Sequence, residues 1–128
     1  MVKTLKNGKV ITFLLILVVG FLVFIFFPKP IDMSIEKVGN GTPAVVFIYD
    51  LNLAASNRQA SEINKAQQTL GDSINFLIAN AGDPTRADFR EKHNAQSADL
   101  LFFDGSGKLI DRSIAVMTAE EFIAKLAK

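Results

Sequence analysis

The chain has 128 residues, of which 49% are hydrophobic and none is cysteine, so this chain can neither perform thiol chemistry nor form disulfides. Its length suits one domain with a short appendage. Ten basic and thirteen acidic residues follow residue 30, so that part carries a net charge of −3 and lacks the basic excess typical of proteins that bind nucleic acid.

The first feature along the chain is an apolar run at residues 10–27, VITFLLILVVGFLVFIFF, in which only Thr12 is polar. A helix of this length covers about 27 Å, close to the roughly 30 Å hydrocarbon core of a bilayer. A cleaved signal peptide is the alternative, but it has a shorter apolar core and a small-residue cleavage site. The run ends in FIFFPKP, which offers no such site. The pattern therefore predicts a retained transmembrane helix.

Lysines flank this run unequally, with Lys3, Lys6 and Lys9 before it and only Lys29 and Lys37 soon after it. By the positive-inside rule, residues 1–9 form a cytoplasmic tail and the rest of the chain crosses the membrane. In a bacterium this would be a single-pass inner-membrane protein with a periplasmic domain.

Residues 28–41 form a predicted connector between the helix and the domain, which we place at residues 42–128. The apolar positions within residues 31–38 fit either an edge strand or a short first helix. Asn40-Gly41-Thr42 matches the N-glycosylation acceptor pattern, but a simple turn is the preferred interpretation.

The domain begins with AVVFIY at residues 44–49, a continuous apolar run typical of a strand that is buried on both faces. A helix follows, because apolar residues then recur every three to four positions. Asn52 could cap its start, or Ser56 and Gln59 could form a capping box one turn later. Gly71-Asp72 ends it.

Helix-capping and turn signals divide the remainder of the chain into elements. Asp83-Pro84 opens a second helix whose inward anchor is Phe89, and Thr118 with Glu121 forms a capping box for the last helix. The two glycines in residues 104–107 predict a hairpin turn. The predicted strands between these signals are residues 73–79, 100–103 and 108–116.

The element order is therefore β-α-β-α-β-β-α, which predicts an α/β domain. Its first two strands form a parallel crossover and its last two an antiparallel hairpin. A mixed four-stranded sheet with flanking helices follows.

This order and its turn chemistry resemble the thioredoxin family over Thr42 to Ala127, about two thirds of the chain. The matching segments are TPAVVFIYD, IANAGDPTRADFREKHN and SADLLFFDGSGKLIDRSIAVMTAEEFIAKL. The resemblance implies a thioredoxin-like fold, preceded in this chain by one transmembrane helix.

The resemblance fails at the family's active site. Residues 52–55, or 53–56 in a shifted register, occupy the position of the C-x-x-C motif and contain no sulfur. Val46 stands where the family has a buried acidic residue, and Ala98 where it has a cis-proline. A cis bond before a non-proline residue costs about 2.5–4 kcal/mol, so we expect the bond before Ala98 to be trans. The hypothesis is a redox-inactive scaffold rather than an enzyme.

Other catalytic chemistry finds little support in the sequence. His93 is the only histidine, and we expect it to be solvent-exposed at a helix end, so we predict no metal and no cofactor. Asp50, Asp99 and Asp104 could cluster at the carboxyl end of the sheet, where capping and turn roles are the preferred interpretation. A cysteine-free enzyme using Asp50 or Asp99 remains an alternative, although we expect no small-molecule substrate.

A surface around the lost active site is the candidate for binding protein partners. The alternative for its two leucines is that they fold beneath the helix. The main hypothesis is an accessory subunit of an envelope assembly, such as a secretion, conjugation or other membrane complex; the second is a chaperone-like holdase. The candidate partner-binding residues are Leu51, Asn52, Leu53, Ala54, Ala55 and Ala98.

Overall fold

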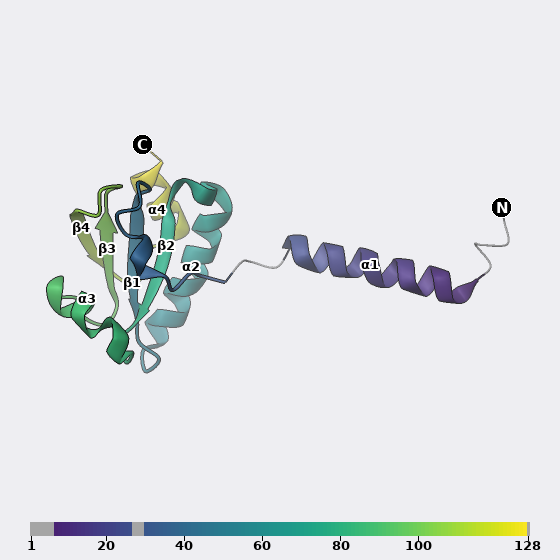
Figure 1. The fold of residues 1–128 in the computed structure, drawn as a ribbon, viewed down its shortest axis with the longest axis horizontal. Coiled ribbons are helices and arrows are strands. Elements are labelled where there is room, and N and C mark those ends of the chain that lie inside the picture. The colour runs from purple at the N-terminus through teal and green to yellow at the C-terminus, as the bar shows by residue number, and fades with distance from the viewer. Residues whose placement is uncertain (1–6, 27–29, 128) are drawn as a thin grey trace.

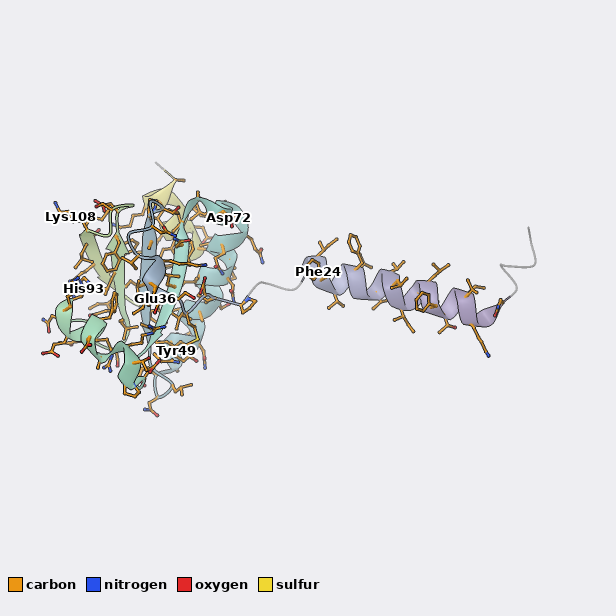
Figure 2. All side chains as sticks on the ribbon, in the orientation of Figure 1. Phe24, Glu36, Tyr49, Asp72, His93 and Lys108 are labelled. Atoms are coloured by element: carbon orange, nitrogen blue, oxygen red, sulfur yellow. The ribbon has the colours of Figure 1, made fainter. Side chains whose placement is uncertain are left out.

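The computed structural model describes residues 7–26 and 30–127, and its first element is a long apolar helix, α1 (Gly8–Phe26). The window Gly8–Ile25 has a mean hydropathy of 2.7 and is long and apolar enough to cross a membrane. The helix lies outside the sheet domain (Figure 1), and its described side chains are exposed (Figure 2). The predicted span began at Val10 and ended at Phe27, which lies outside the described residues together with the tail at 1–6.

The connector lies against the sheet. Asp32 forms a single parallel bridge with Leu77, and its carbonyl accepts a hydrogen bond of 2.8 Å from the Ile78 N–H. A short 3₁₀ helix, η2 (Ile35–Lys37), follows. Residues 31–38 therefore contain part of each expected alternative, an edge-strand bridge at Asp32 and a short helix at Ile35–Lys37. Asn40 forms a turn, with its Oδ1 accepting from the Thr42 N–H at 3.1 Å.

Four strands form one sheet in the order β2-β1-β3-β4 (Figure 1). β1 pairs parallel with β2 through the crossover helix α2 (Ala54–Leu70), whereas β1–β3 and β3–β4 are antiparallel. The predicted mixed four-stranded sheet is confirmed. The strand bounds are β1 Ala44–Tyr49, β2 Asn75–Asn80, β3 Asp99–Phe103 and β4 Leu109–Ile114.

Helix α2 begins where neither sequence alternative placed it. Leu53 is its N-cap residue and makes no side-chain capping bond, while Ser56 and Gln59 are fully buried within the helix. Gly71, at φ +56°, ends it as predicted, because a left-handed φ favours glycine. A 3₁₀ turn, η3 (Gly71–Ser73), then leads into β2.

The other helices start at their predicted caps. Asp83 accepts from the Thr85 N–H at 2.9 Å, with Pro84 at the first position of η4 (Pro84–Arg86), which continues into α3 (Ala87–Lys92). α4 (Ala119–Leu126) opens on a complete capping box, in which the Glu121 N–H donates to the Thr118 hydroxyl and the Glu121 carboxylate accepts from the Thr118 N–H.

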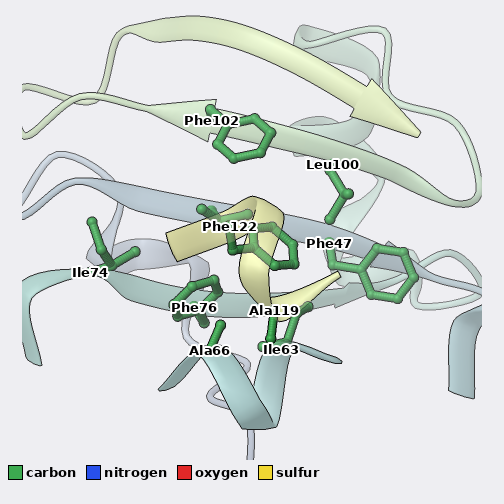
Figure 3. Packing of buried hydrophobic residues seen from close by; sticks show 10 residues of the cluster. Phe47, Ile63, Ala66, Ile74, Phe76, Leu100, Phe102, Ala119 and Phe122 are labelled. Carbon is green, nitrogen blue, oxygen red and sulfur yellow. The ribbon is translucent and has the colours of Figure 1, made fainter. Parts of the chain in front are cut away.

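The core lies on both faces of the sheet, which explains the uninterrupted apolar run of β1. One face packs against α2 and α4, where Phe122 makes edge contacts with Phe76 at 5.6 Å between ring centroids (Figure 3). The other face packs against η2 and α3 and includes Val46, Ile48, Leu101 and Phe103. None of the described α1 residues contributes to either cluster, so the domain has a complete core of its own.

Candidate protein-binding surface

Three chain segments meet at the end of β1. Because β3 runs antiparallel to β1, the turn before β3 lies beside the loop after β1. The Ala98 N–H donates to the Ile48 carbonyl, and the Ala98 carbonyl accepts from the Ala115 N–H, both at 2.9 Å. The Ser97 hydroxyl donates to Asp50 Oδ2 at 2.8 Å. These bonds hold the β1–α2 loop, the turn before β3 and the segment after β4 together.

Asp50 organises the β1–α2 loop. Its Oδ1 accepts from the Asn52 N–H at 2.9 Å, and its own N–H donates to the buried Ser56 hydroxyl at 3.0 Å. The bond from Asn52, followed by that from Ser97, lowers the pKa of Asp50 below its ordinary value. A general acid or base near neutral pH needs a shift in the opposite direction. Asp50 therefore acts as an ionised hydrogen-bond acceptor that fixes the loop.

The loop held in this way presents its leucines to solvent. Leu51 is 82% exposed and Leu53 38% exposed, so the interpretation that both fold beneath the helix is wrong. Asn52 and Ala54 are also exposed and Ala55 is half-buried. An exposed apolar group gains free energy when a partner removes it from water, at about 25 cal/mol per Å².

Ala98 takes the place of the family's cis-proline in a different conformation. Its φ is +74°, and the bond before it is trans, as predicted. The residue is half-buried, with both of its backbone groups bonded to neighbouring segments. Ala98 therefore joins Leu51 and Leu53 at one end of the sheet.

Two exposed apolar residues at this end were missed by the sequence analysis. Ile114 pairs with Asp99 at the end of β4 and is 70% exposed, and Val116 just beyond it is 39% exposed. The alternation within residues 108–116 contained a signal, but only the β3–β4 register shows which positions stay uncovered. We call the combined set the loop-end surface: Leu51, Asn52, Leu53, Ala54, Ala55, Ala98, Ile114 and Val116.

A buried glutamine supports this surface from below. Gln59 is 0% exposed, and its amide forms two bonds with the backbone of Met117, from Nε2 to the carbonyl at 2.9 Å and from the N–H to Oε1 at 2.6 Å. Glu62, one turn later on α2, accepts from the Ala119 N–H at 3.1 Å. These three bonds tie α2 to the segment that follows Val116. No local pattern predicted this role for Gln59, whose spacing from Ser56 suggested a cap.

The redox site is missing from this end of the sheet. Val46 is fully buried among apolar side chains, so no acid stands beneath the loop. Residues 52–55 contain no sulfur. In residues 7–26 and 30–127, no group of three or more His, Cys, Asp or Glu residues is placed to hold a metal ion.

The three aspartates do not cluster as expected. Asp104 follows β3 at the opposite end of the sheet, since Phe103 pairs with Ala44 at the start of β1. Its carboxylate accepts from Ser106 and Lys108 in the hairpin turn. The reason is the antiparallel direction of β3, which sends its carboxyl end away from Asp50.

His93 is half-buried, and the prediction of an exposed residue was therefore wrong. Its ring packs 4.7 Å from the Phe89 ring and 5.1 Å from the Phe103 ring, measured between centroids. Burial, followed by the nearby Lys92 and Arg112 charges, lowers the pKa of His93. The ring therefore serves as a neutral packing element beside α3.

Comparison with known proteins supports the fold alone. No family model and no curated protein matches the sequence. Among solved structures, an uncharacterised thioredoxin-like protein from Clostridium perfringens superposes with a TM-score of 0.69 at 14% identity, over 82% of this chain and 84% of that one.

Two further solved structures have a similar fold. Thioredoxin-2, described as a component of malaria parasite protein secretion machinery, has a TM-score of 0.61 at 17% identity, over 67% of this chain and 82% of its own. Thioredoxin O2 from Arabidopsis thaliana has a TM-score of 0.61 at 12% identity, over 73% and 82%. This chain therefore has a thioredoxin-like fold without the cysteines.

Proposed function

We propose that this chain is a membrane-anchored, redox-inactive thioredoxin-like protein that binds other proteins through its loop-end surface. One observation carries the proposal: in and directly before the segment that replaces the C-x-x-C motif, this chain exposes Leu51 at 82% and Leu53 at 38%. A protein that only needed the scaffold would gain solubility from polar residues at these positions.

The rigidity of the surface supports a binding role. Asp50 fixes the loop through Asn52 and Ser97, and Gln59 fixes the segment around Met117. Groups held in place before binding lose less conformational entropy when a partner docks, which raises affinity for a given contact area. Leu51 and Leu53 are therefore displayed on a preorganised frame.

The cellular setting follows from the anchor and the lysine asymmetry. We place the N-terminus in the cytoplasm and the domain on the far side of the membrane, which in a bacterium means the inner membrane and the periplasm. There the protein acts as an accessory subunit of a secretion, conjugation or other membrane complex. Thioredoxin-2 of the malaria parasite, a component of that parasite's secretion machinery, offers a precedent for this fold in such an assembly.

Co-purification in mild detergent from cells at native expression tests the proposal. We expect stoichiometric partners with the wild type, and their loss with Leu51→Asp or Leu53→Asp. Truncation of a binding hot spot costs about 2 kcal/mol or more, which weakens affinity roughly thirtyfold. Ile110→Asp is the matched control, because Ile110 is 61% exposed on β4 outside the loop-end surface. A wild-type monomer, or equal recovery with all three variants, contradicts the proposal.

A holdase role is the second candidate, favoured by the same exposed Leu51. It predicts that the purified protein suppresses aggregation of an unfolding client and that Leu53→Asp abolishes the effect. Stable partners of fixed stoichiometry support the subunit role instead, whereas absence of suppression at several-fold excess rejects the holdase.

A further inference from the structure

The chain that joins α1 to the domain is very short. Three residues, 27–29, separate Phe26 from Pro30, and four Cα–Cα steps of 3.8 Å reach at most about 15 Å. α1 has 19 residues and is about 28 Å long, so it just fills a hydrocarbon core of roughly 30 Å. The headgroup layer adds about 5–8 Å on each side. Pro30 therefore lies no more than about 10 Å beyond that layer.

The connector is attached to the domain directly after Pro30. Ile31 packs against the core cluster beneath α2, and Asp32 adds to the outer edge of β2 through its bridge with Leu77. The β2 side is consequently the part of the domain that the short tether keeps nearest to the membrane. β3, β4 and α3 lie on the opposite side (Figure 1).

The β2 side carries a shallow groove of about 280 Å³. Its apolar residues are Ile31, Met33 and Ile78, and Met33 is 46% exposed. Its polar residues are Tyr49, Asn64 and Asn80, so none of the described residues that line it is charged. Apolar side chains mixed with tyrosine hydroxyl and amide groups suit the interfacial layer of a bilayer, where apolar and hydrated groups meet.

We propose that this groove side, defined by Ile31, Met33, Tyr49, Asn64, Ile78 and Asn80, docks on the surface of the bilayer that α1 spans. Met33 enters the headgroup layer, and the groove receives the glycerol and ester region of a phospholipid. The inference rests on the proposed membrane span. Because the groove is uncharged, docking requires neither anionic lipid nor low salt.

This docking sets the direction of the rest of the domain. Neighbouring strands are about 4.8 Å apart, so β4 lies about 19 Å from the Asp32 position, four spacings away across the sheet. The loop-end surface lies at the ends of the strands rather than at the β2 edge. It therefore opens sideways along the membrane and stays accessible when the groove side is docked.

Single-cysteine labelling tests the proposal directly, because the chain contains no cysteine of its own. The full chain is reconstituted as one copy per phosphatidylcholine nanodisc, with a fluorophore at Met33→Cys, Ile110→Cys or Val18→Cys. Quenching is measured with a nitroxide lipid and with aqueous iodide. Ile110 on β4 is the matched exposed control, and Val18 reports the span.

We expect the Met33 label to be quenched several-fold more by the nitroxide lipid than the Ile110 label, and less by iodide, with no change at high salt. Equal quenching at both positions, with Val18 protected in lipid, overturns the docking and leaves the span intact. Quenching of the Val18 label by aqueous iodide refutes the span itself. Docking that appears only with anionic lipid overturns the assignment to the uncharged groove.

Discussion

Gln59→Met removes the paired hydrogen bonds that join α2 to Met117 while keeping the side-chain volume nearly constant. The change leaves one backbone N–H and one carbonyl without partners, each at a cost of about 1–3 kcal/mol if fully buried. Met117 is half-buried, so water recovers part of this cost and we expect a loss of about 3 kcal/mol. For a domain of this size, that lowers the melting temperature by roughly 12–24 °C.

The assay is thermal and urea unfolding of the full chain in mild detergent, followed by circular dichroism. Gln68→Met is the matched control, because Gln68 is exposed on the same helix and its loss changes stability by less than about 0.5 kcal/mol. Gln59→Glu recovers stability on acidification, since a protonated carboxyl can both donate and accept as the amide does. A loss below about 1 kcal/mol for Gln59→Met would refute the role assigned to these bonds.

Three further predictions concern stability in the same assay. Thr118→Ala removes the α4 cap and costs about 1 kcal/mol, against almost nothing for Thr69→Ala at an exposed position. Because the pKa of His93 is lowered in the folded state, the unfolded chain binds a proton at this residue at a higher pH than the folded chain does. The free energy of unfolding therefore falls as the pH drops below about 6.5, and His93→Gln makes this fall less steep. The Lys37 ammonium lowers the pKa of Asp32 to about 2, so that pair stabilises the fold above pH 4 and loses its effect toward pH 2. Asp32→Asn should cost up to about 1 kcal/mol at pH 7, and the difference from wild type should shrink as the pH falls through about 2.

Local patterns in the sequence were sufficient for the sheet and most helix caps. The run AVVFIY predicted a strand buried on both faces, and it lies between two core clusters. Asp83 and Thr118 predicted helix starts because a cap is a short-range interaction between residues two or three positions apart.

Long-range contacts decided the features that the sequence left open. Ser56 and Gln59 have the spacing of a capping box, but their side chains bond to Asp50 and to Met117, the latter 58 positions away. The loop that exposes Leu51 is likewise tied down by the bond from Ser97 to Asp50, two residues 47 positions apart. No local pattern contains these pairings.

The anchor and the loop-end surface together explain how a small apolar patch could hold a partner. Confining two proteins to one membrane raises their effective concentration, so a weak contact becomes a stable association without any added contact. A fragment that begins at Pro30 keeps every described member of both core clusters and the whole loop-end surface.

We therefore expect this fragment to bind a membrane-embedded partner about 10²–10⁴-fold more weakly than the full chain does in the same bilayer. Calorimetric unfolding of the fragment provides the control for folding, and Leu53→Asp should weaken both forms by the same factor. Equal affinity of fragment and full chain would mean that the domain alone supplies the binding energy. The anchor would then serve localisation only. The surface that contacts the partner would have to be much larger than the loop-end surface.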